Sequence, residues 1–407
     1  MNVAVNLRAK PVVLVFARYF LIDNFKSTFG AVSDEFEVEC LTDGSHSGTP
    51  DTRRDFYAAL KAGTRSAEIT AEAEADIIQR CRALRNFDPA RASQLVHAMA
   101  LALGAALDRV RPAAIASQMV DEYVTHTLSV LAARRGIGYF GYCAGYFPGV
   151  SLLLADGHGR PFEWRDADAA EVDATLAEVS QRAFRQLYNL GASYGLPRHL
   201  CQMARYRVKR AVFALSGWWQ RDRWNIHYVI TPFLAERRWL KDYPRRAFFH
   251  DDWQGEIARL RAERPGARVL YMPLGFFPEA TIDYWIGNTR AIDYEALVLE
   301  MVRTLAQDDI VVVKEHLHMM GSRSGEFLRA LRSIPGAVSV HPLELSNAVV
   351  ERADAVVLGT GSPGIEAAIR GKPVFSFSDT SYWFRAVGAT FLDIDALERW
   401  PDRKSVV

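Results

Sequence analysis

Residues 357–375, VLGTGSPGIEAAIRGKPVF, combine a glycine-rich loop with the start of a helix. Pro363 suits the first helical position, which makes Ser362 the expected N-cap. Free N–H groups and the positive end of the helix dipole favour a phosphate there, and glycines let the backbone approach it closely. The residues expected to bind this phosphate are Thr360, Gly361, Ser362 and Gly364. The alternative is a well-capped turn between a strand and a helix.

A carboxylate follows within the same helix. A capping box places its acid three residues after the N-cap, at position 365, whereas the acid here is Glu366. Glu366 is therefore not needed for capping, and it can accept hydrogen bonds from a ribose diol while the loop holds the phosphates. The alternative is a surface salt bridge.

A second candidate is the segment VVVKEHLHMM, residues 311–320, where polar side chains follow a buried apolar strand. Ligands of open parallel sheets bind beyond the carboxyl ends of the strands. We therefore expect Lys314 and His316 to contact a nucleotide, with His318 on the same face as His316. No third ligand is suitably spaced, so we expect no metal site. The alternative is a charged strand end that simply meets solvent.

A third candidate is the aromatic loop of residues 271–285, YMPLGFFPEATIDYW. Phe276 or Phe277 can stack on a base. Pro278 and Glu279 follow, and the glutamate can order a sugar hydroxyl. The alternative is local core packing by the aromatic rings.

In the first half of the chain, Asp121 and Glu122 follow a short expected strand at the start of a helix. An acid at this position caps a helix well, and it can also act as a general base or nucleophile. His126 lies one turn after Glu122 and can pair with it. Weaker candidates for the same edge are Asp43 and His46 of the polar loop 42–51, and Gly145 and Tyr146 after the next strand.

The hydrophobic pattern predicts the elements that position these residues. Strands are expected over 11–20 and 36–48, and two helices between 66 and 109. A strand–helix–strand unit follows, with its strand at 113–117 and its helix at 122–135, and it predicts a parallel sheet. A second series begins at 268, with strands over 268–274, 309–316, 337–342, 354–360 and 373–378 and helices over 294–307, 325–334, 346–353 and 363–370. This alternation predicts an open, doubly wound α/β sheet.

Length and composition indicate the domain organisation and the classes of partner to expect. The chain has 407 residues, 49% of them hydrophobic, and a formal net charge of +1. We expect two Rossmann-like domains facing an interdomain cleft: 1–250, with a helical insertion over about 165–245, and 251–407. The near-neutral charge argues against nucleic acid as a partner. Four widely spaced cysteines indicate free thiols, and no run of 18 apolar residues occurs, so we expect a cytoplasmic protein.

The basic aromatic segment 205–224, RYRVKRAVFALSGWWQRDRW, bears on partners. Its mixture of cations, valines and tryptophans predicts a peripheral contact with anionic lipid at the cytoplasmic face of the inner membrane. The alternative is a solvated helix with an apolar core face.

The motifs YMPLGFFPEA, VVVKEH, SVHP and GTGSPGIEAAIRGKPVFSF occur in an order and spacing similar to those of bacterial capsule polysaccharide biosynthesis proteins. That family includes GT-B glycosyltransferases of surface glycans, some of which use CMP-Kdo. The resemblance covers about residues 268–382, and the first half of the chain matches in outline. Leu317 stands where the family often has proline, and Phe277 where it often has a polar residue.

The resemblance implies a GT-B-like fold whose second domain holds the donor nucleotide. The donor site would comprise the glycine loop with Glu366, the strand end with Lys314 and His316, and the Pro278–Glu279 turn. The leading hypothesis is a metal-independent glycosyltransferase that needs no cofactor. It would move a sugar from a nucleotide-activated donor, CMP-Kdo included, to a surface-polysaccharide or lipopolysaccharide acceptor, a glycan or glycolipid. Asp121 or Glu122 would act on the acceptor or the anomeric centre. The alternatives are a nucleotide-sugar epimerase similar to UDP-GlcNAc 2-epimerases, and a non-catalytic glycan-assembly protein with a nucleotide fold.

Overall fold

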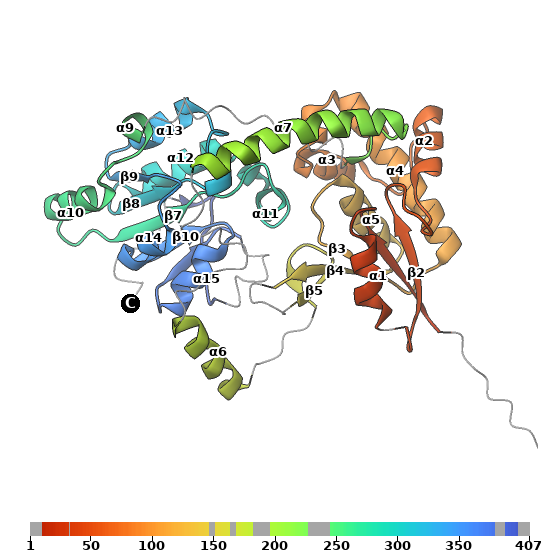
Figure 1. The fold of residues 1–407 in the computed structure, drawn as a ribbon, viewed down its shortest axis with the longest axis horizontal. Coiled ribbons are helices and arrows are strands. Elements are labelled where there is room, and N and C mark those ends of the chain that lie inside the picture. The colour runs from red at the N-terminus through yellow and green to blue at the C-terminus, as the bar shows by residue number, and fades with distance from the viewer. Residues whose placement is uncertain are drawn as a thin grey trace, which may run out of the picture. The chain divides into compact units, whose positions relative to one another are not determined.

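A computed structural model describes most of the chain. The described residues are 10–31, 33–145, 151–162, 168–181, 196–226, 245–378 and 387–397. The chain forms two compact units (Figure 1). Unit 1 comprises Met1–Gly145, Ser151–Glu163 and Phe213–Ile230, and unit 2 comprises Tyr146–Val150, Trp164–Val212 and Thr231–Val407.

Unit 1 is built on a six-stranded sheet in the order β2-β1-β3-β4-β5-β6. Its strands are β1 (Val12–Ala17), β2 (Glu37–Thr42), β3 (Ala114–Gln118), β4 (Gly138–Ala144), β5 (Ser151–Ala155) and β6 (Arg160–Pro161). The first four run parallel, which confirms the predicted strand–helix–strand unit. The last two are antiparallel additions that the sequence pattern did not indicate. In β1 the four residues 14–17 are fully buried, as predicted for an apolar strand inside a parallel sheet.

The helices of unit 1 connect these strands. They are α1 (Ile22–Gly30), α2 (Arg53–Ala62), α3 (Ala71–Arg80), α4 (Pro89–Val110) and α5 (Tyr123–Arg134). The two helices predicted between 66 and 109 are α3 and α4. Helix α4 begins with proline after Asp88, whose carboxylate accepts hydrogen bonds from the backbone N–H groups of Ala90 and Arg91. Helix α2 was not predicted from the sequence, and Phe56 is its one buried residue.

Unit 2 has a six-stranded, all-parallel sheet in the order β12-β11-β10-β7-β8-β9. Its strands are β7 (Val269–Pro273), β8 (Ile310–Lys314), β9 (Ala337–Val340), β10 (Ala355–Leu358), β11 (Val374–Ser376) and β12 (Thr390–Phe391). Read in chain order, this is the 3-2-1-4-5-6 arrangement of Rossmann sheets, which confirms the predicted doubly wound fold.

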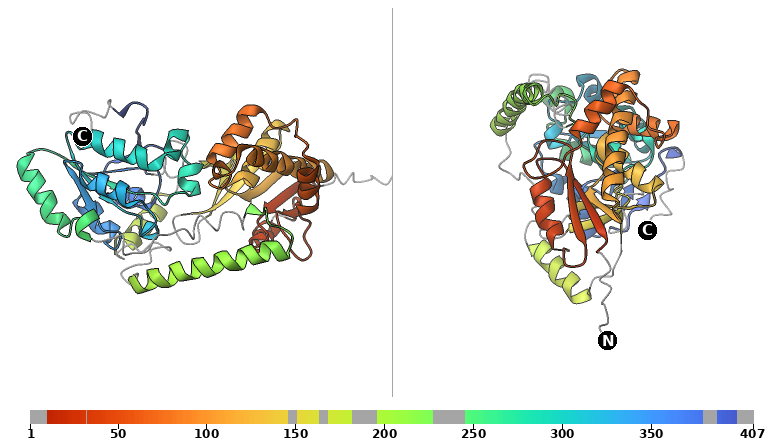
Figure 2. Two further views of the ribbon diagram at one scale, coloured as in Figure 1. Left: turned by 90° about the horizontal axis from the view of Figure 1, so that it is seen from above. Right: turned by 90° about the vertical axis from the view of Figure 1, so that its right-hand side faces the viewer.

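Helices cover both faces of this sheet (Figures 1 and 2). One apolar core lies between the sheet and α9 (Arg245–Phe248), α12 (Tyr294–Leu305) and α13 (Gly325–Arg332). A second core lies under α10 (Trp253–Glu263), α14 (Ser346–Arg352) and α15 (Ser362–Ile369). The short α11 (Ala280–Asp283) follows β7. The sheet is therefore buried on both sides, and its strands are accordingly rich in valine, isoleucine and leucine.

The helical region expected over about 165–245 is described in part. It contains α6 (Ala169–Gln181) and α7 (Leu196–Trp219), and the division between the units falls within α7, after Val212. Residues 165–167, 182–195 and 227–244 of that region lie outside the described residues. No helix in the described part of the chain is both long and apolar enough to cross a bilayer.

Each sheet has a point at which the chain changes direction along it. In unit 1 this point lies between β1 and β3, and in unit 2 between β7 and β10. Loops leaving the carboxyl ends of these adjacent strands diverge to opposite faces, and the crevice between them is where such sheets bind ligands. The predicted site residues follow β3, β7, β8 and β10.

Candidate functional site

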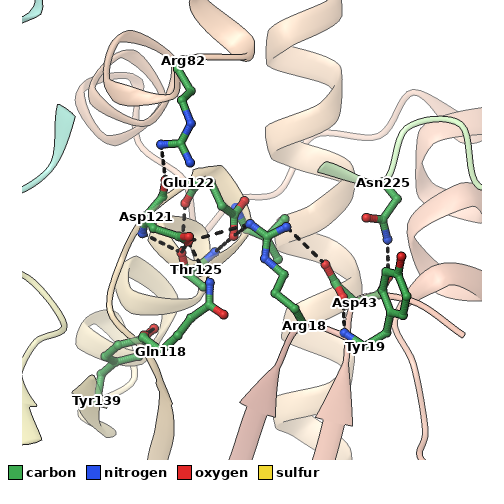
Figure 3. A network of polar contacts seen from close by, with 11 residues as sticks. Arg18, Tyr19, Asp43, Arg82, Gln118, Asp121, Glu122, Thr125, Tyr139 and Asn225 are labelled. Carbon is green, nitrogen blue, oxygen red and sulfur yellow. Dashed lines mark hydrogen bonds and ion pairs between the residues drawn. The ribbon is translucent and has the colours of Figure 1, made fainter. Parts of the chain in front are cut away.

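In unit 1, four charged residues meet at the carboxyl edge of the sheet. Arg18 follows β1, Asp43 follows β2, and Asp121 and Glu122 follow β3, and these strands are neighbours. The Arg18 guanidinium lies 3.1 Å from Glu122 Oε1, 3.7 Å from Asp43 Oδ2 and 3.8 Å from Asp121 Oδ1. Figure 3 shows it between Asp43 and the Asp121–Glu122 pair. Burial lowers the pKa of Arg18, but the three carboxylates outweigh it and hold the pKa above its usual value.

Glu122 is fully buried and caps α5. Its carboxylate accepts hydrogen bonds from the backbone N–H groups of Val124, at 2.7 Å, and Thr125, at 3.1 Å. Burial raises the pKa of Glu122 to about 7, although Arg18 and the two N–H donors oppose the rise. Since both carboxylate oxygens are engaged by these partners, Glu122 has a structural role: it caps α5 and holds Arg18 in place.

Asp121 is the more accessible of the two acids, with its side chain 33% exposed. Its Oδ1 accepts a hydrogen bond from the Gln118 side-chain amide at 2.8 Å, and its backbone carbonyl accepts one from Arg82 at 2.9 Å. The hydroxyl of Thr125 lies 3.4 Å from the same Oδ1 (Figure 3). These contacts fix the Asp121 carboxylate at the edge of the sheet while leaving it open to a ligand.

Asp43 is buried and orients Arg18. Its Oδ1 accepts a hydrogen bond from the Tyr19 backbone at 3.0 Å, and its carbonyl accepts one from the Asn225 side chain at 3.2 Å. Burial raises the pKa of Asp43, and the nearby Arg18 lowers it. Sequence interpretation noted Asp43 but missed Arg18, because a lone arginine after a strand is indistinguishable from a surface cation.

Two other candidates of unit 1, His126 and His46, contact residues outside this cluster. The imidazole of His126 is 3.5 Å from Asp76 Oδ2 and packs edge-on against His158, and burial lowers its pKa. The predicted pairing with the Glu122 carboxylate is not among the contacts that these described residues show. His46 contacts Thr49 and Asp23, each at 3.2 Å. Gly145 follows β4, and Tyr146 lies outside the described residues.

In unit 2 the glycine loop joins β10 to α15. The predicted N-cap is wrong by one residue, since α15 begins at Ser362 and Gly361 is the N-cap. Gly361 has φ 128°, a conformation that residues with a Cβ rarely adopt, and no side chain caps the helix. Gly364 is buried within the first turn, and Thr360, Gly361 and Ser362 are partly exposed. The first turn of α15 is therefore open to an anion at its N-terminal end.

Lys314 ends β8 and Glu366 lies in α15, which follows β10, so 52 positions separate them in the chain. Both are buried, with 6% and 5% of their surface exposed. Burial lowers the pKa of Lys314 to about 8, and the charges of Glu315, Glu344 and Glu366 oppose that shift. The alternative of a surface salt bridge at Glu366 is wrong, because the side chain is buried. Lys314 and Glu366 are thus a buried cation and a buried carboxylate whose charges interact.

Three half-buried rings form a cluster in the loops that follow β7 and β8. The ring centres of Phe276 and His316 are 5.6 Å apart, as are those of His316 and His318, and Phe276 lies 6.4 Å from His318. The Nδ1 atom of His316 accepts a hydrogen bond from the His318 backbone at 3.2 Å, which fixes its ring. This cluster offers flat apolar faces of the kind on which a base stacks.

The Pro278–Glu279 turn connects the two sides of the crevice. Glu279 caps α11, where its carboxylate accepts hydrogen bonds from the backbone N–H of Thr281, at 2.9 Å, and from the Thr281 hydroxyl. Thr360 in turn donates to the Thr281 carbonyl at 3.4 Å. The loops after β7 and β10 are therefore linked at the switch point of the sheet.

A buried ion pair that sequence interpretation missed braces the aromatic loop. Arg323 Nε lies 2.7 Å from Glu315 Oε2, and both side chains are essentially inaccessible. Arg323 also donates to the carbonyl of Gly275 and lies over the ring of Tyr294, whose hydroxyl accepts from the Gly275 N–H at 2.6 Å. No pattern in the sequence distinguishes Arg323 from its surface neighbours. Within the described residues, no group of three His, Cys, Asp or Glu side chains is placed to hold a metal ion.

No protein-family model and no curated protein sequence matches the chain. Similar solved structures include KpsC of Thermosulfurimonas dismutans, a beta Kdo 2,7 transferase, with 16% identity, TM-score 0.32 and 71% of this chain and 72% of that chain covered. They also include UDP-GlcNAc 2-epimerase of Methanocaldococcus jannaschii in complex with UDP-GlcNAc and UDP, with 11% identity, TM-score 0.27 and 95% and 90% covered. A third is S. aureus MnaA with UDP, with 10% identity, TM-score 0.26 and 94% and 83% covered. At these identities and TM-scores the similarities do not establish the family or the activity of this chain.

Proposed function

We propose that this chain is a glycosyltransferase of GT-B type that takes a sugar from a nucleotide-activated donor. The observation that carries the proposal is the set of groups at the carboxyl edge of the unit 2 sheet. The open end of α15 follows β10, the buried Lys314 ends β8, and a cluster of half-buried rings follows β7 and β8. Glu366 is a buried carboxylate within α15 whose charge acts on Lys314. A nucleotide sugar presents a phosphate, a ribose diol and a base, and each of these has a matching group.

Each chemical group of the donor is matched to residues of unit 2. The phosphates accept hydrogen bonds from the N–H groups of the first turn of α15. Lys314 supports them with its positive charge, since its pKa of about 8 leaves it largely protonated at neutral pH. Glu366 accepts hydrogen bonds from the ribose hydroxyls. The rings of Phe276 and His316 contact the face or the edge of the base. Glu279 and Pro278 keep a supporting role, because Glu279 already caps α11.

The acid of unit 1 is assigned to the acceptor. The Asp121 carboxylate accepts the proton of the acceptor hydroxyl as its oxygen bonds to the anomeric carbon, and the bond from that carbon to the donor phosphate breaks. The electron pair leaves with the phosphate, where the helix end and Lys314 stabilise the negative charge. This positive charge is supplied by the chain itself, so we propose a transfer that needs no divalent metal. The motif resemblance to capsule polysaccharide proteins supports a surface-glycan acceptor, with CMP-Kdo as the first donor to try.

The test is a titration with CMP, UDP, GDP and their sugar conjugates, followed by thermal unfolding. One nucleotide should raise the unfolding temperature of the protein. Glu366→Gln should weaken that binding roughly tenfold to a hundredfold, since a hydrogen bond to a charged group contributes about 1.5–3 kcal/mol. Glu351→Gln, on the exposed surface of α14, is the matched control and should bind as the wild type does. Stabilisation by none of these compounds would refute the proposal.

Incubating the bound donor without an acceptor separates transfer from epimerisation. A transferase leaves the sugar configuration unchanged under these conditions. Appearance of the epimer would replace the transferase proposal with the epimerase alternative.

A further inference from the structure

A cavity of about 760 Å³ opens in unit 1 where α2, α4 and the end of α7 approach one another. Three tryptophans line it: Trp218, Trp219 and Trp224. Four cations line it as well, Lys61, Arg91, Arg221 and Arg223, and its lining contains no acidic residue. None of these residues has a role in the transfer chemistry proposed above. The cavity therefore offers apolar rings and positive charge together, which suits an anion that carries apolar groups.

The floor of the cavity is fixed. The guanidinium carbons of Arg91 and Arg223 lie 5.1 and 5.4 Å from the centre of the Trp224 ring. The backbone N–H of Trp224 donates to the Tyr57 hydroxyl at 3.1 Å, and that hydroxyl donates to the buried Asp222 at 3.0 Å. The rings and charges are thus held in place without a ligand.

The rim of the cavity is strongly apolar and exposed. Trp218 and Trp219 are 71% and 79% exposed, and Leu215, one turn earlier in α7, is 64% exposed. Val208 and Val212 are also exposed, and the spacing 208, 212, 215 and 219 places these side chains on one face of the helix. An exposed apolar stripe of this kind marks a surface that meets another apolar phase or partner.

The positive charge of the same segment indicates which kind of partner binds this surface. From Leu196 to Arg221 the sequence contains six cations and no aspartate or glutamate: Arg198, Arg205, Arg207, Lys209, Arg210 and Arg221. The whole chain has a formal net charge of only +1, so this concentration is local. A helix with tryptophan, leucine and valine on one face and many arginines and lysines beside them is typical of binding to an anionic membrane surface.

We propose that the stripe of α7 and the tryptophan cavity form a docking site for the surface of an anionic phospholipid bilayer. The side chains of Val208, Val212, Leu215 and the two exposed tryptophans enter the interface, and the cavity cations pair with lipid phosphates. An acidic glycan in solution would pair with the cations but would leave the valines and Leu215 in water. None of these residues is among those assigned to the nucleotide.

Flotation of the purified full-length protein with lipid vesicles tests the proposal. The protein should float with vesicles of phosphatidylcholine and phosphatidylglycerol and remain unbound with phosphatidylcholine alone. Arg221 has φ 55°, in the region that glycine prefers, so Arg221→Gly removes a cation without straining the backbone. This variant should bind about fivefold more weakly, because one cation near an anionic surface contributes about a factor of five in affinity. Trp219→Ala should weaken binding at least as much.

Arg111→Gly is the matched control. Arg111 is also an exposed arginine at a helix end with a positive φ, 51°, and it lies outside the cavity lining. Its replacement should leave flotation unchanged. An equal loss of vesicle binding in Arg111→Gly and Arg221→Gly would refute the proposed docking site. Three other results would overturn the proposal: no flotation with anionic vesicles, equal binding of Trp219→Ala, or a dimer that Trp219→Ala dissociates. None of them would alter the nucleotide titration, so the two proposals fail separately.

Discussion

At the scale of single residues, unit 1 assigns different tasks to two adjacent carboxylates. Glu122 is inaccessible and engaged by Arg18 and two backbone N–H groups, whereas Asp121 is partly exposed. The sequence places both at the start of a helix, where either can cap it. Only the local backbone decides which one turns inward, and the inward residue takes the capping role.

The burial of Glu122 has a consequence for stability. Its pKa is raised from an ordinary value of 4.5 to about 7. Between these values the folded state retains a proton that the unfolded state has lost. This contribution to stability is therefore fully present below about pH 4.5 and declines as the pH rises through 7, by at most about 1.4 kcal/mol per pH unit. Glu122→Gln should remove that slope, whatever it does to the absolute stability.

Urea unfolding of the wild type and Glu122→Gln at a series of pH values measures this effect. The difference between their unfolding free energies should change with pH across that window. Glu263→Gln, which alters an exposed carboxylate of α10, should run parallel to the wild type. Parallel curves for Glu122→Gln would mean that the carboxylate remains ionised beside Arg18.

Sequence interpretation named candidate residues in both units, and it missed two buried arginines held by ion pairs. Lys314 and Glu366 were named because each follows a recognisable strand or loop signal, and both are buried in the structure. Arg18 and Arg323 were missed because each owes its role to carboxylates distant in the chain. A single sequence carries no signal for such pairing.

At the scale of elements, the strand–helix alternation of unit 2 was predictable almost throughout. Its strands are continuous apolar runs, and its helices have clear apolar faces. The elements that were missed are α2 and several short ones, such as the β5–β6 hairpin and the two residues of β12. The start of α15 was misplaced by one residue because the N-cap is a glycine chosen for its conformation, which residue-type preferences for capping do not capture.

That glycine gives a prediction for the helix end. Gly361→Ala must place a Cβ at φ 128°, which costs about 1–3 kcal/mol or shifts the loop, and should weaken nucleotide binding roughly tenfold by displacing the N–H groups of α15. Gly371→Ala is the control, since Gly371 has φ 66° at the other end of the same helix. It should also lose stability but keep its nucleotide affinity, as measured by isothermal titration calorimetry. Equal affinities in the two variants would argue against a phosphate at this helix end.

At the scale of the whole molecule, the overall composition does not show how charge is distributed along the chain. A net charge of +1 predicts no extended basic surface, yet one helix carries five cations and no acid. Likewise, the two sheets have different strand orders, and each has its own switch point with its own set of charged residues. The proposed acceptor chemistry, donor binding and membrane docking are therefore tied to different loops, and they can be perturbed one at a time.

Hydrogen–deuterium exchange on the whole chain tests this separation. A bound nucleotide protects the backbone groups it contacts, and it stabilises local structure in proportion to its occupancy. Saturating nucleotide should slow exchange most in the loops of residues 274–279, 314–318 and 359–366 of unit 2. The loops that follow β2 and β3 in unit 1 should change less, because their three carboxylates outnumber the one guanidinium of Arg18 and repel a phosphate. Stronger protection around Arg18 than around Gly361 would place the nucleotide on unit 1 and reverse the assignment of donor and acceptor.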